Sequence, residues 1–163
     1  MSGAVLVVDD EPVTRHLVTR MLQSAGYVVV SATTAAEAES VVASGFVGVI
    51  VLDVQLPDET GPEVFPRLQK LGPQNPVIFL TSHRSAALAL DSIQGGALDC
   101  IDKADLRTRL LPTVERAQEL SLKREMPTNI ISCADNMKPV FRAISQVRDS
   151  SVPVLILGES GTG

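Results

Sequence analysis

Aromatic residues are scarce in this chain of 163 residues, which has no tryptophan, one tyrosine and four phenylalanines. A sizeable core must therefore be built from Val, Leu, Ile and Ala. Only two cysteines occur, Cys100 and Cys133, and they have neither CxxC spacing nor companion histidines. This favours reduced, packed thiols in a cytoplasmic protein over a disulfide framework or a cysteine-based metal site.

Long positive or apolar runs are also missing. The net charge is −5, and no run of lysine or arginine is long enough to follow a nucleic-acid backbone, so nothing supports direct nucleic-acid binding by this segment. The chain begins in a strand-like run without a charged leader, and no apolar stretch approaches the roughly 20 residues of a membrane span. We therefore expect a cytoplasmic protein without membrane contact.

Short apolar runs alternate with longer amphipathic segments from Ala4 to Asp105. This pattern is typical of buried parallel strands separated by helices. The predicted strands are Ala4–Val8, Tyr27–Ser31, Val47–Leu52, Pro76–Leu80 and Leu98–Ile101. The predicted helices are Pro12–Ala25, Thr34–Ser44, Pro62–Leu71 and Arg84–Gln94, with another after Asp105. Five such units predict a doubly wound α/β domain with a five-stranded parallel sheet.

Two prolines fall inside predicted helices. Pro66 and Pro112 would each remove one backbone hydrogen bond, so we expect a kink there or a helix that begins close to the proline. Pro12, by contrast, suits a first helical turn, and Gly26 suits the left-handed position that follows a helix.

Polar side chains follow four of the predicted strands. They are Asp9, Asp10 and Glu11 after the first strand, Asp53 at the third, Thr81 and Ser82 at the fourth, and Lys103 after the fifth. Because ligands of open α/β sheets bind beyond the carboxyl ends of the strands, we expect these side chains to share one site. An acidic pair alone could be only a favourable charge at a helix N-terminus, but the joint placement favours a functional site.

Three carboxylates at one sheet edge need a cation. Asp9, Asp10 and Asp53 would repel one another unless a positive charge neutralised them. Mg²⁺ suits such oxygen ligands, because it takes one or two carboxylates and completes its shell with water, a carbonyl and phosphate oxygen. A carboxylate beside that ion can attack a phosphoryl group, while Lys103 and the Thr81 hydroxyl contact phosphoryl oxygens.

The motifs VLVVDDEP, DVQLPDETG, TSHRS and GALDCIDK resemble those of the response-regulator receiver family over residues 4–120. The resemblance implies a flavodoxin-like sheet with strand order 2-1-3-4-5. It further implies that Asp53 accepts the phosphoryl group, that Thr81 is the switch hydroxyl and that Lys103 is the phosphoryl partner. The implied Mg²⁺ ligands are Asp10, Asp9 through water, Asp53 and the backbone carbonyl of Gln55.

Two residues depart from the family pattern. Cys100 stands where such domains usually have an aromatic residue that changes rotamer, which puts the usual coupling from hydroxyl to aromatic ring in doubt. Ala104 replaces the proline that usually follows the lysine. A cis bond before a residue other than proline costs about 3 kcal/mol, so we expect the Lys103–Ala104 bond to be trans or strained. The chemistry is therefore expected to be intact and the signal transmission unusual.

After Leu120 the composition changes. Residues 121–129 (SLKREMPTN) are polar and show no apolar period, which indicates a linker after a domain of residues 1–120. Residues 130–163 end in GESGTG, whose Gly158, Gly161 and Gly163 have the form of a phosphate-binding loop. They resemble the truncated start of the AAA+ ATPase domain of sigma-54-dependent, NtrC-like transcriptional activators. Without the lysine and hydroxyl residue that complete the loop, useful ATP binding is not expected.

The leading hypothesis is a phosphorylation switch in which a sensor histidine kinase supplies the phosphoryl group for Asp53. The bound group would shift an equilibrium between two arrangements of the fourth helix and fifth strand, and so control the attached ATPase module. Sigma-54 RNA polymerase and DNA would be contacted only through domains absent from this chain. A constitutive interaction module is the alternative, motivated by Cys100 and Ala104, and a nucleotide-dependent enzyme is a third reading.

The apolar face of the final predicted helix leaves two interpretations open. Its residues could form a homodimer interface that responds to phosphorylation, or they could simply pack against the sheet. These residues are Leu106, Leu110, Val114, Ala117 and Leu120.

Overall fold

A computed structural model describes residues 3–72, 75–82 and 97–125 of the chain. Five parallel strands form one sheet in the order β2-β1-β3-β4-β5, which confirms the predicted fold class and strand order. The strands are β1 (Ala4–Val8), β2 (Val29–Ala32), β3 (Val47–Asp53), β4 (Val77–Thr81) and β5 (Asp99–Asp102). The helices are α1 (Pro12–Ser24), α2 (Ala35–Ala43), α3 (Gly61–Leu71), the short 3₁₀ helix η1 (Lys103–Asp105) and α5 (Leu106–Glu125).

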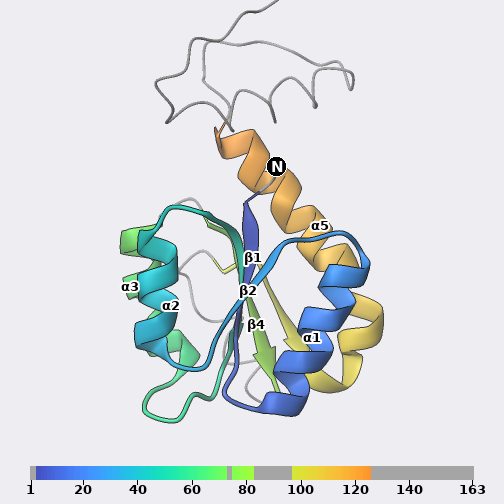
Figure 1. Cartoon of the computed structure of the whole chain (residues 1–163), viewed down its shortest axis with the longest axis horizontal. Helices are drawn as coiled ribbons and strands as arrows, with labels where there is room; N and C mark the ends of the chain where they lie inside the picture. Colours follow the sequence, from blue (N-terminus) through green and yellow to red (C-terminus); the bar gives the residue numbers. More distant parts are fainter. Residues whose placement is uncertain (1–2, 73–74, 83–96, 126–163) are drawn as a thin grey trace, which may run out of the picture. The chain divides into compact units, whose positions relative to one another are not determined.

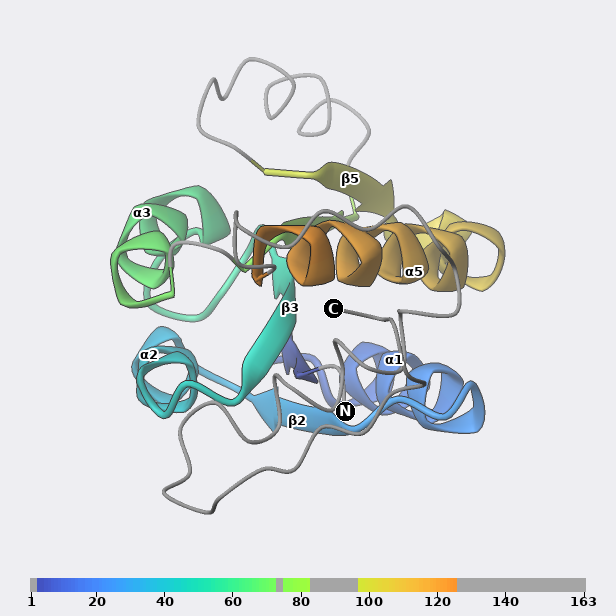
Figure 2. The same cartoon turned by 90° about the horizontal axis from the view of Figure 1, so that it is seen from above.

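Helices cover both faces of the sheet. α1 and α5 lie on one face and α2 and α3 on the other, as two views at right angles show (Figure 1, Figure 2). The predicted helix Arg84–Gln94 and the glycine-rich segment with Gly158, Gly161 and Gly163 lie outside the described residues. None of the helices in the described ranges has the length and apolarity that crossing a bilayer requires.

Successive residues of the central strands point to opposite faces and build two separate clusters. In β1, Leu6 and Val8 pack toward α2 and α3, whereas Val5 and Val7 pack toward α1 and α5. Because both faces are covered, β1, β3 and β4 are buried along their whole length, which explains why their sequences are continuous apolar runs. Full burial of each Leu or Val contributes about 1.5–3 kcal/mol.

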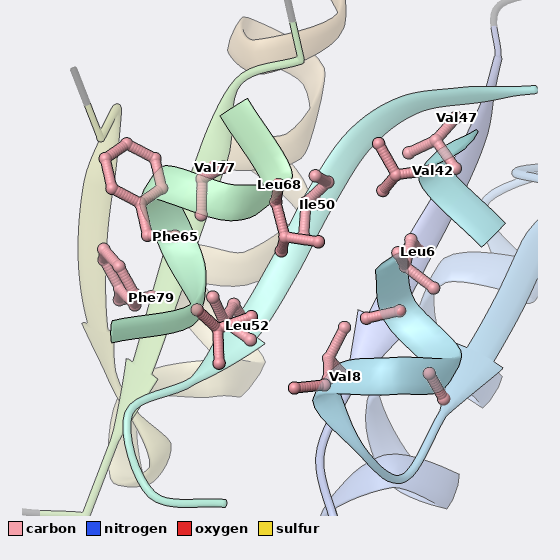
Figure 3. Close-up of a cluster of buried hydrophobic side chains, with 14 of the residues drawn as sticks. Leu6, Val8, Val42, Val47, Ile50, Leu52, Phe65, Leu68, Val77 and Phe79 are labelled. Atoms are coloured by element: carbon pink, nitrogen blue, oxygen red, sulfur yellow. The ribbon is translucent and has the colours of Figure 1, made fainter. Parts of the chain in front are cut away.

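The cluster between the sheet and α2 and α3 contains two of the few aromatic rings. Phe65 of α3 meets Phe79 of β4 edge to face, with ring centroids 5.7 Å apart and planes at 63°. Such a pair adds about 0.5–1.5 kcal/mol to the burial of its surface. Figure 3 shows both rings beside Leu52, Leu68 and Val77, all from the same cluster. The ring pair therefore anchors α3 to the strand next to β3.

Local sequence signals set most helix ends. Pro12 lies in the first turn of α1, and Gly26 follows the helix with φ of 87°, as predicted. Thr34 caps α2 by accepting a hydrogen bond from the Glu37 N–H at 3.3 Å. At α3 the Glu63 carboxylate accepts from the backbone N–H of Thr60 at 2.8 Å, the reciprocal half of a capping box.

Neither internal proline starts its helix. α3 begins at Gly61 and runs through Pro66, and α5 begins at Leu106 and runs through Pro112, so the expectation of a helix start near either proline is wrong. Both prolines lie on the exposed side of their helices. The carbonyl that loses its partner there can be hydrated, while apolar neighbours such as Phe65 and Leu68 hold the helix on the sheet.

The inner face of α5 belongs to the core. Leu106, Leu110, Val114 and Ala117 are at most 2% exposed and pack against the sheet in the cluster that also contains α1. The packing interpretation of these four residues is therefore confirmed, and a homodimer through the face of the last helices stays a prediction. Leu120 is only partly buried.

The final helix is longer than the sequence indicated. α5 continues to Glu125, so a domain boundary at Leu120 and a linker beginning at Ser121 are placed too early. Ser121 lies four residues after Ala117, which puts it on the same inner face, and it is only 6% exposed. The charged residues that suggested a linker are good helix formers and extend the last turns. Ser2–Glu125 form one compact unit.

Candidate functional site

The predicted polar residues meet at the carboxyl edge of the sheet. Asp9 follows β1, Asp53 is the last residue of β3, Thr81 is the last residue of β4, and Lys103 follows β5 as the first residue of η1. Because β1 and β3 are hydrogen-bonded neighbours in register, Val8 pairs with Leu52 and the next residues carry Asp9 and Asp53 side by side. The strand order thus creates the site.

The three aspartates form one acidic cluster. Asp9 is fully buried, Asp53 is 4% exposed and Asp10 is exposed, yet one oxygen from each lies within 4.8 Å of the others. Backbone N–H groups fix one oxygen of each buried carboxylate. Glu11 donates to Asp9 Oδ1 at 2.8 Å, and Gln55 donates to Asp53 Oδ1 at 3.1 Å.

The second oxygens of the buried carboxylates face Lys103. Its Nζ donates to Asp53 Oδ2 at 2.6 Å and lies 2.9 Å from Asp9 Oδ2 and 3.5 Å from a carboxylate oxygen of Glu11. The contact with Asp9 is an ion pair only, because Asp9 Oδ2 accepts no well-directed hydrogen bond from the residues described. A buried oxygen without a directed donor is available to another cation.

Burial and the contacts between opposite charges have opposing effects on the pKa values of Asp9 and Lys103. Burial raises the pKa of Asp9, and the charge of Asp53 adds to that effect while Lys103 opposes it. Burial alone would lower the pKa of Lys103, but its contacts with Asp53 and Asp9 outweigh burial, so its pKa is raised. The Lys103 ammonium therefore stays charged at neutral pH, and the ionised Asp9 carboxylate is held at a cost in free energy.

The loop between β3 and α3 borders the site and is tied at several points. Leu56 N–H donates to Glu59 O at 3.1 Å and Gly61 N–H donates to Val54 O at 2.9 Å, so the Gln55 carbonyl takes no part in these two bonds. The Arg67 guanidinium then holds the Glu59 carboxylate with two hydrogen bonds of 2.7 Å. The same arginine binds Glu39 of α2 at 2.6 Å, which joins the loop to two helices.

The residues of this edge fit a divalent cation with a preference for oxygen. Asp9 and Asp10 present carboxylate oxygens beside Asp53, one of them without a directed donor, and the Gln55 carbonyl is free of the loop bonds described above. A hard ion such as Mg²⁺ takes this kind of ligand set. The donor chemistry therefore agrees with the Mg²⁺ expectation.

The remaining predicted residues lie nearby. Thr81 is 2% exposed at the end of the strand beside β3. Cys100 pairs in register with Phe79 and packs, partly buried, against the cluster on the α2 and α3 face. No peptide bond in the described residues is cis, so the bond between Lys103 and Ala104 is trans.

Sequence reasoning missed the role of two residues, Gly61 and Arg15. Gly61 lies so close to the backbone that a Cβ atom there would clash with the Asp53 carbonyl oxygen. Arg15 contacts the site from α1, next to Glu11, which the sequence predicted at this edge of the sheet. Gly61 ends the motif DVQLPDETG and could have been noticed, but the reach of the Arg15 side chain has no signature in one sequence.

The profile that describes the response regulator receiver domain matches residues 5–115. With the sheet order and the edge cluster described above, this shows that the chain belongs to the response regulator receiver family, whose members are phosphoacceptor switches of two-component systems. A CheY-like receiver domain from Methanospirillum hungatei JF-1 has the same fold, with a TM-score of 0.69 and 27% identity over 76% of this chain and 99% of that one.

The chain also matches longer transcriptional regulators over nearly its whole length. The chain is 33% identical over 170 residues to the DNA-binding transcriptional regulator NtrC of Escherichia coli, covering 99% of this chain and 36% of NtrC. It is 30% identical to the C4-dicarboxylate transport regulator DctD of Rhizobium meliloti, of which it covers 39%. The structure of NtrX from Brucella abortus matches with 30% identity and a TM-score of 0.69 over 90% of this chain and 35% of NtrX. The chain spans little more than a third of these relatives.

Proposed function

We propose that Asp53 accepts a phosphoryl group from the phosphohistidine of a sensor kinase in a Mg²⁺-dependent reaction. The contact of Lys103 with Asp53 at 2.6 Å, beside two further carboxylates within 4.8 Å of each other and of Asp53, gives the main support. An ion pair needed only for stability would gain nothing from extra carboxylates, because their burial and mutual repulsion cost free energy. A site for a metal and a phosphoryl group needs all of them.

In this proposal a carboxylate oxygen of Asp53 attacks the phosphorus of the donor. The new P–O bond forms as the P–N bond to the donor imidazole breaks, and the released nitrogen takes a proton from solvent. Lys103 keeps its proton because its pKa is raised, so its ammonium can contact an oxygen of the transferred group. The Thr81 hydroxyl, from the neighbouring strand end, supplies a second contact.

Asp9, Asp10, Asp53 and the backbone carbonyl of Gln55 would hold the metal. Bound Mg²⁺ supplies neutralisation of the carboxylates and of the charge that develops on the phosphoryl oxygens. The response regulator TrrA of Thermotoga maritima, solved in complex with Mg²⁺ and BeF, is 29% identical with a TM-score of 0.61 over 72% of this chain. That relative supports the same pairing of metal and phosphoryl mimic here.

Intact mass spectrometry tests the acceptor. The whole chain is incubated with Mg²⁺ and acetyl phosphate, and the expected result is one phosphoryl adduct that EDTA suppresses. Asp53→Asn should abolish the adduct, whereas Asp58→Asn, which removes an exposed aspartate from the adjoining loop, should leave it unchanged. An adduct that survives in Asp53→Asn, or none in the wild type, contradicts the proposal.

The output of the switch belongs to a larger protein. We propose that the chain is the receiver part of an NtrC-like, sigma-54-dependent activator, that residues 130–163 begin its ATPase module, and that the protein works in the cytoplasm. The nearly full coverage of this chain by NtrC supports this, as does an NtrX structure in complex with ATP that covers 90% of this chain. Polymerase and DNA would be contacted by parts of that protein beyond this chain.

Cys100 and Ala104 favour a second candidate function, a constitutive interaction module that does not switch. Cys100 occupies the β5 position opposite Phe79 without an aromatic ring, and Ala104 follows Lys103 through a trans bond. Hydrogen exchange of the phosphorylated and unphosphorylated chain separates the two candidates. A switch predicts altered exchange in β5 and α5, whereas phosphorylation with no change in exchange or oligomeric state favours the constitutive module.

A further inference from the structure

Arg15 connects the second turn of α1 to the loop that carries the acidic pair. Its Nη1 donates to the backbone carbonyl of Asp9 at 2.8 Å and to that of Asp10 at 3.1 Å. The Arg15 side chain is half-buried. Two successive carbonyls in a loop of three residues are thus held by one nitrogen of the guanidinium group.

These bonds restrain the backbone on both sides of Asp10. Asp9 is held at its N–H, which donates to Ala32 O at 3.2 Å, and at its Oδ1, which accepts from the Glu11 N–H. That Glu11 N–H belongs to the same peptide group as the Asp10 carbonyl, so this group is held from both sides, by Asp9 Oδ1 and by Arg15. The peptide group between Asp9 and Asp10 is held by Arg15 through the Asp9 carbonyl. Arg15 therefore restrains both peptide groups that flank the exposed Asp10.

We propose that Arg15 is a positioning residue of the Mg²⁺ site, which holds the Asp9 and Asp10 backbone so that both carboxylates keep the orientation that the ion requires. This inference rests on the metal site of the proposed function. Removal of outer contacts that orient metal ligands typically weakens metal affinity by roughly 10–100-fold. We expect an effect in this range when the guanidinium is removed.

The direction in which Mg²⁺ affinity changes when Arg15 is replaced distinguishes a positioning role from a purely electrostatic one. A positive arginine near a divalent cation repels it, so loss of the charge alone should strengthen Mg²⁺ binding. Loss of positioning should weaken it. The charge of Arg15 is also partly balanced by Glu37 at the start of α2, with which it interacts electrostatically, so the repulsive effect is small.

Titration calorimetry with MgCl₂ on the whole 163-residue chain tests the proposal. Arg15→Met should raise the Mg²⁺ Kd by roughly tenfold or more. Arg15→Lys keeps the charge, but its amine ends one bond short of the position of Nη1, the atom that reaches both carbonyls, so this variant should also bind more weakly. Arg20→Met is the matched control, because it removes the same charge from an exposed position on the same helix and should leave the Kd unchanged or slightly lower.

The titrations of the wild type and the Arg15 variants separate failure of the metal site from failure of the positioning role. Absence of Mg²⁺ binding by the wild type removes the metal site of the proposed function, and with it the basis for a role of Arg15. A wild type that binds Mg²⁺ while Arg15→Met binds equally or more tightly overturns the positioning role alone. Thermal melts without Mg²⁺ establish that the variants are folded at the titration temperature. If Arg15→Met does not fold, Arg15→Lys decides the question, and wild-type affinity in that variant refutes the proposal.

Discussion

Replacement of Lys103 by methionine should destabilise the Mg²⁺-free protein at neutral pH by about 3 kcal/mol. The variant keeps most of the aliphatic stem and removes only the charge. The Lys103 side chain is 14% exposed, and the two carboxylate side chains it faces are 0% and 5% exposed. Its loss leaves two buried negative charges without a neighbouring cation, which is the situation that costs most in a buried ion pair.

The distances from Lys103 to the two carboxylates limit how large this loss of stability can be. A unit charge pair at 2.6 Å or 2.9 Å interacts by about 6 kcal/mol at an effective dielectric constant of 20. Desolvation of the lysine offsets much of that attraction, and in the variant a proton can neutralise Asp9, whose pKa burial already raises. The net effect should therefore be near the lower end of the 3–5 kcal/mol range for broken buried pairs.

Urea denaturation at pH 7 in EDTA is the assay. Lys70→Met, which removes an exposed lysine from α3, is the control and should change the free energy of unfolding by less than about 0.5 kcal/mol. In an Asp9→Asn, Asp53→Asn background, Lys103→Met should cost under about 1 kcal/mol, because its two buried partners are uncharged and only the exposed Glu11 carboxylate remains. If Lys103→Met is no more destabilising than Lys70→Met, the ion-pair reasoning is refuted.

Three further predictions follow from the same cluster and its surroundings. Because burial raises the pKa of Asp9 above its ordinary 3.8, the fold loses stability as pH rises through that range, so Asp9→Asn should stabilise the Mg²⁺-free protein at pH 7 but not at pH 3 in thermal melts. Mg²⁺ at a hundredfold excess over its Kd should add about 2.7 kcal/mol to the wild type and much less to Asp9→Asn, as urea titrations would show. Gly61→Ala, whose Cβ would clash with the Asp53 carbonyl oxygen, should cost about 1–3 kcal/mol and slow phosphorylation measured by intact mass.

The central strands were predictable because their environment is simple. β1, β3 and β4 are covered on both faces, so each is a continuous apolar run, and the predicted bounds differ from the observed ones by at most one residue. β2 was placed two residues too early at its start. It is an edge strand, and Tyr27 and Val28 extend its apolar run: the Val28 carbonyl still accepts a hydrogen bond from the Val5 N–H at 2.8 Å, but Val29 is the first residue to pair in register.

The site was predictable in position but not in its internal bonding. The rule that ligands bind at the carboxyl edge of a parallel sheet places Asp9, Asp53 and Lys103 together from sequence alone. It does not distinguish the fully buried Asp9 from the exposed Asp10, because that difference depends on how the loop turns into α1. The contact between Arg15 and the loop depends on the reach of a long side chain, which spacing does not encode.

A crystal structure of this chain with Mg²⁺ and beryllofluoride would show whether Asp53, Lys103 and the metal ligands act as one site. We expect the fluoride group to be bound to an oxygen of Asp53 and to contact the Lys103 ammonium and the Thr81 hydroxyl. The ion should be held directly by Asp10, Asp53 and the Gln55 carbonyl, and by Asp9 through water. Beryllofluoride on any other carboxylate, or a Lys103 that keeps its present contacts and ignores the group, would contradict this expectation.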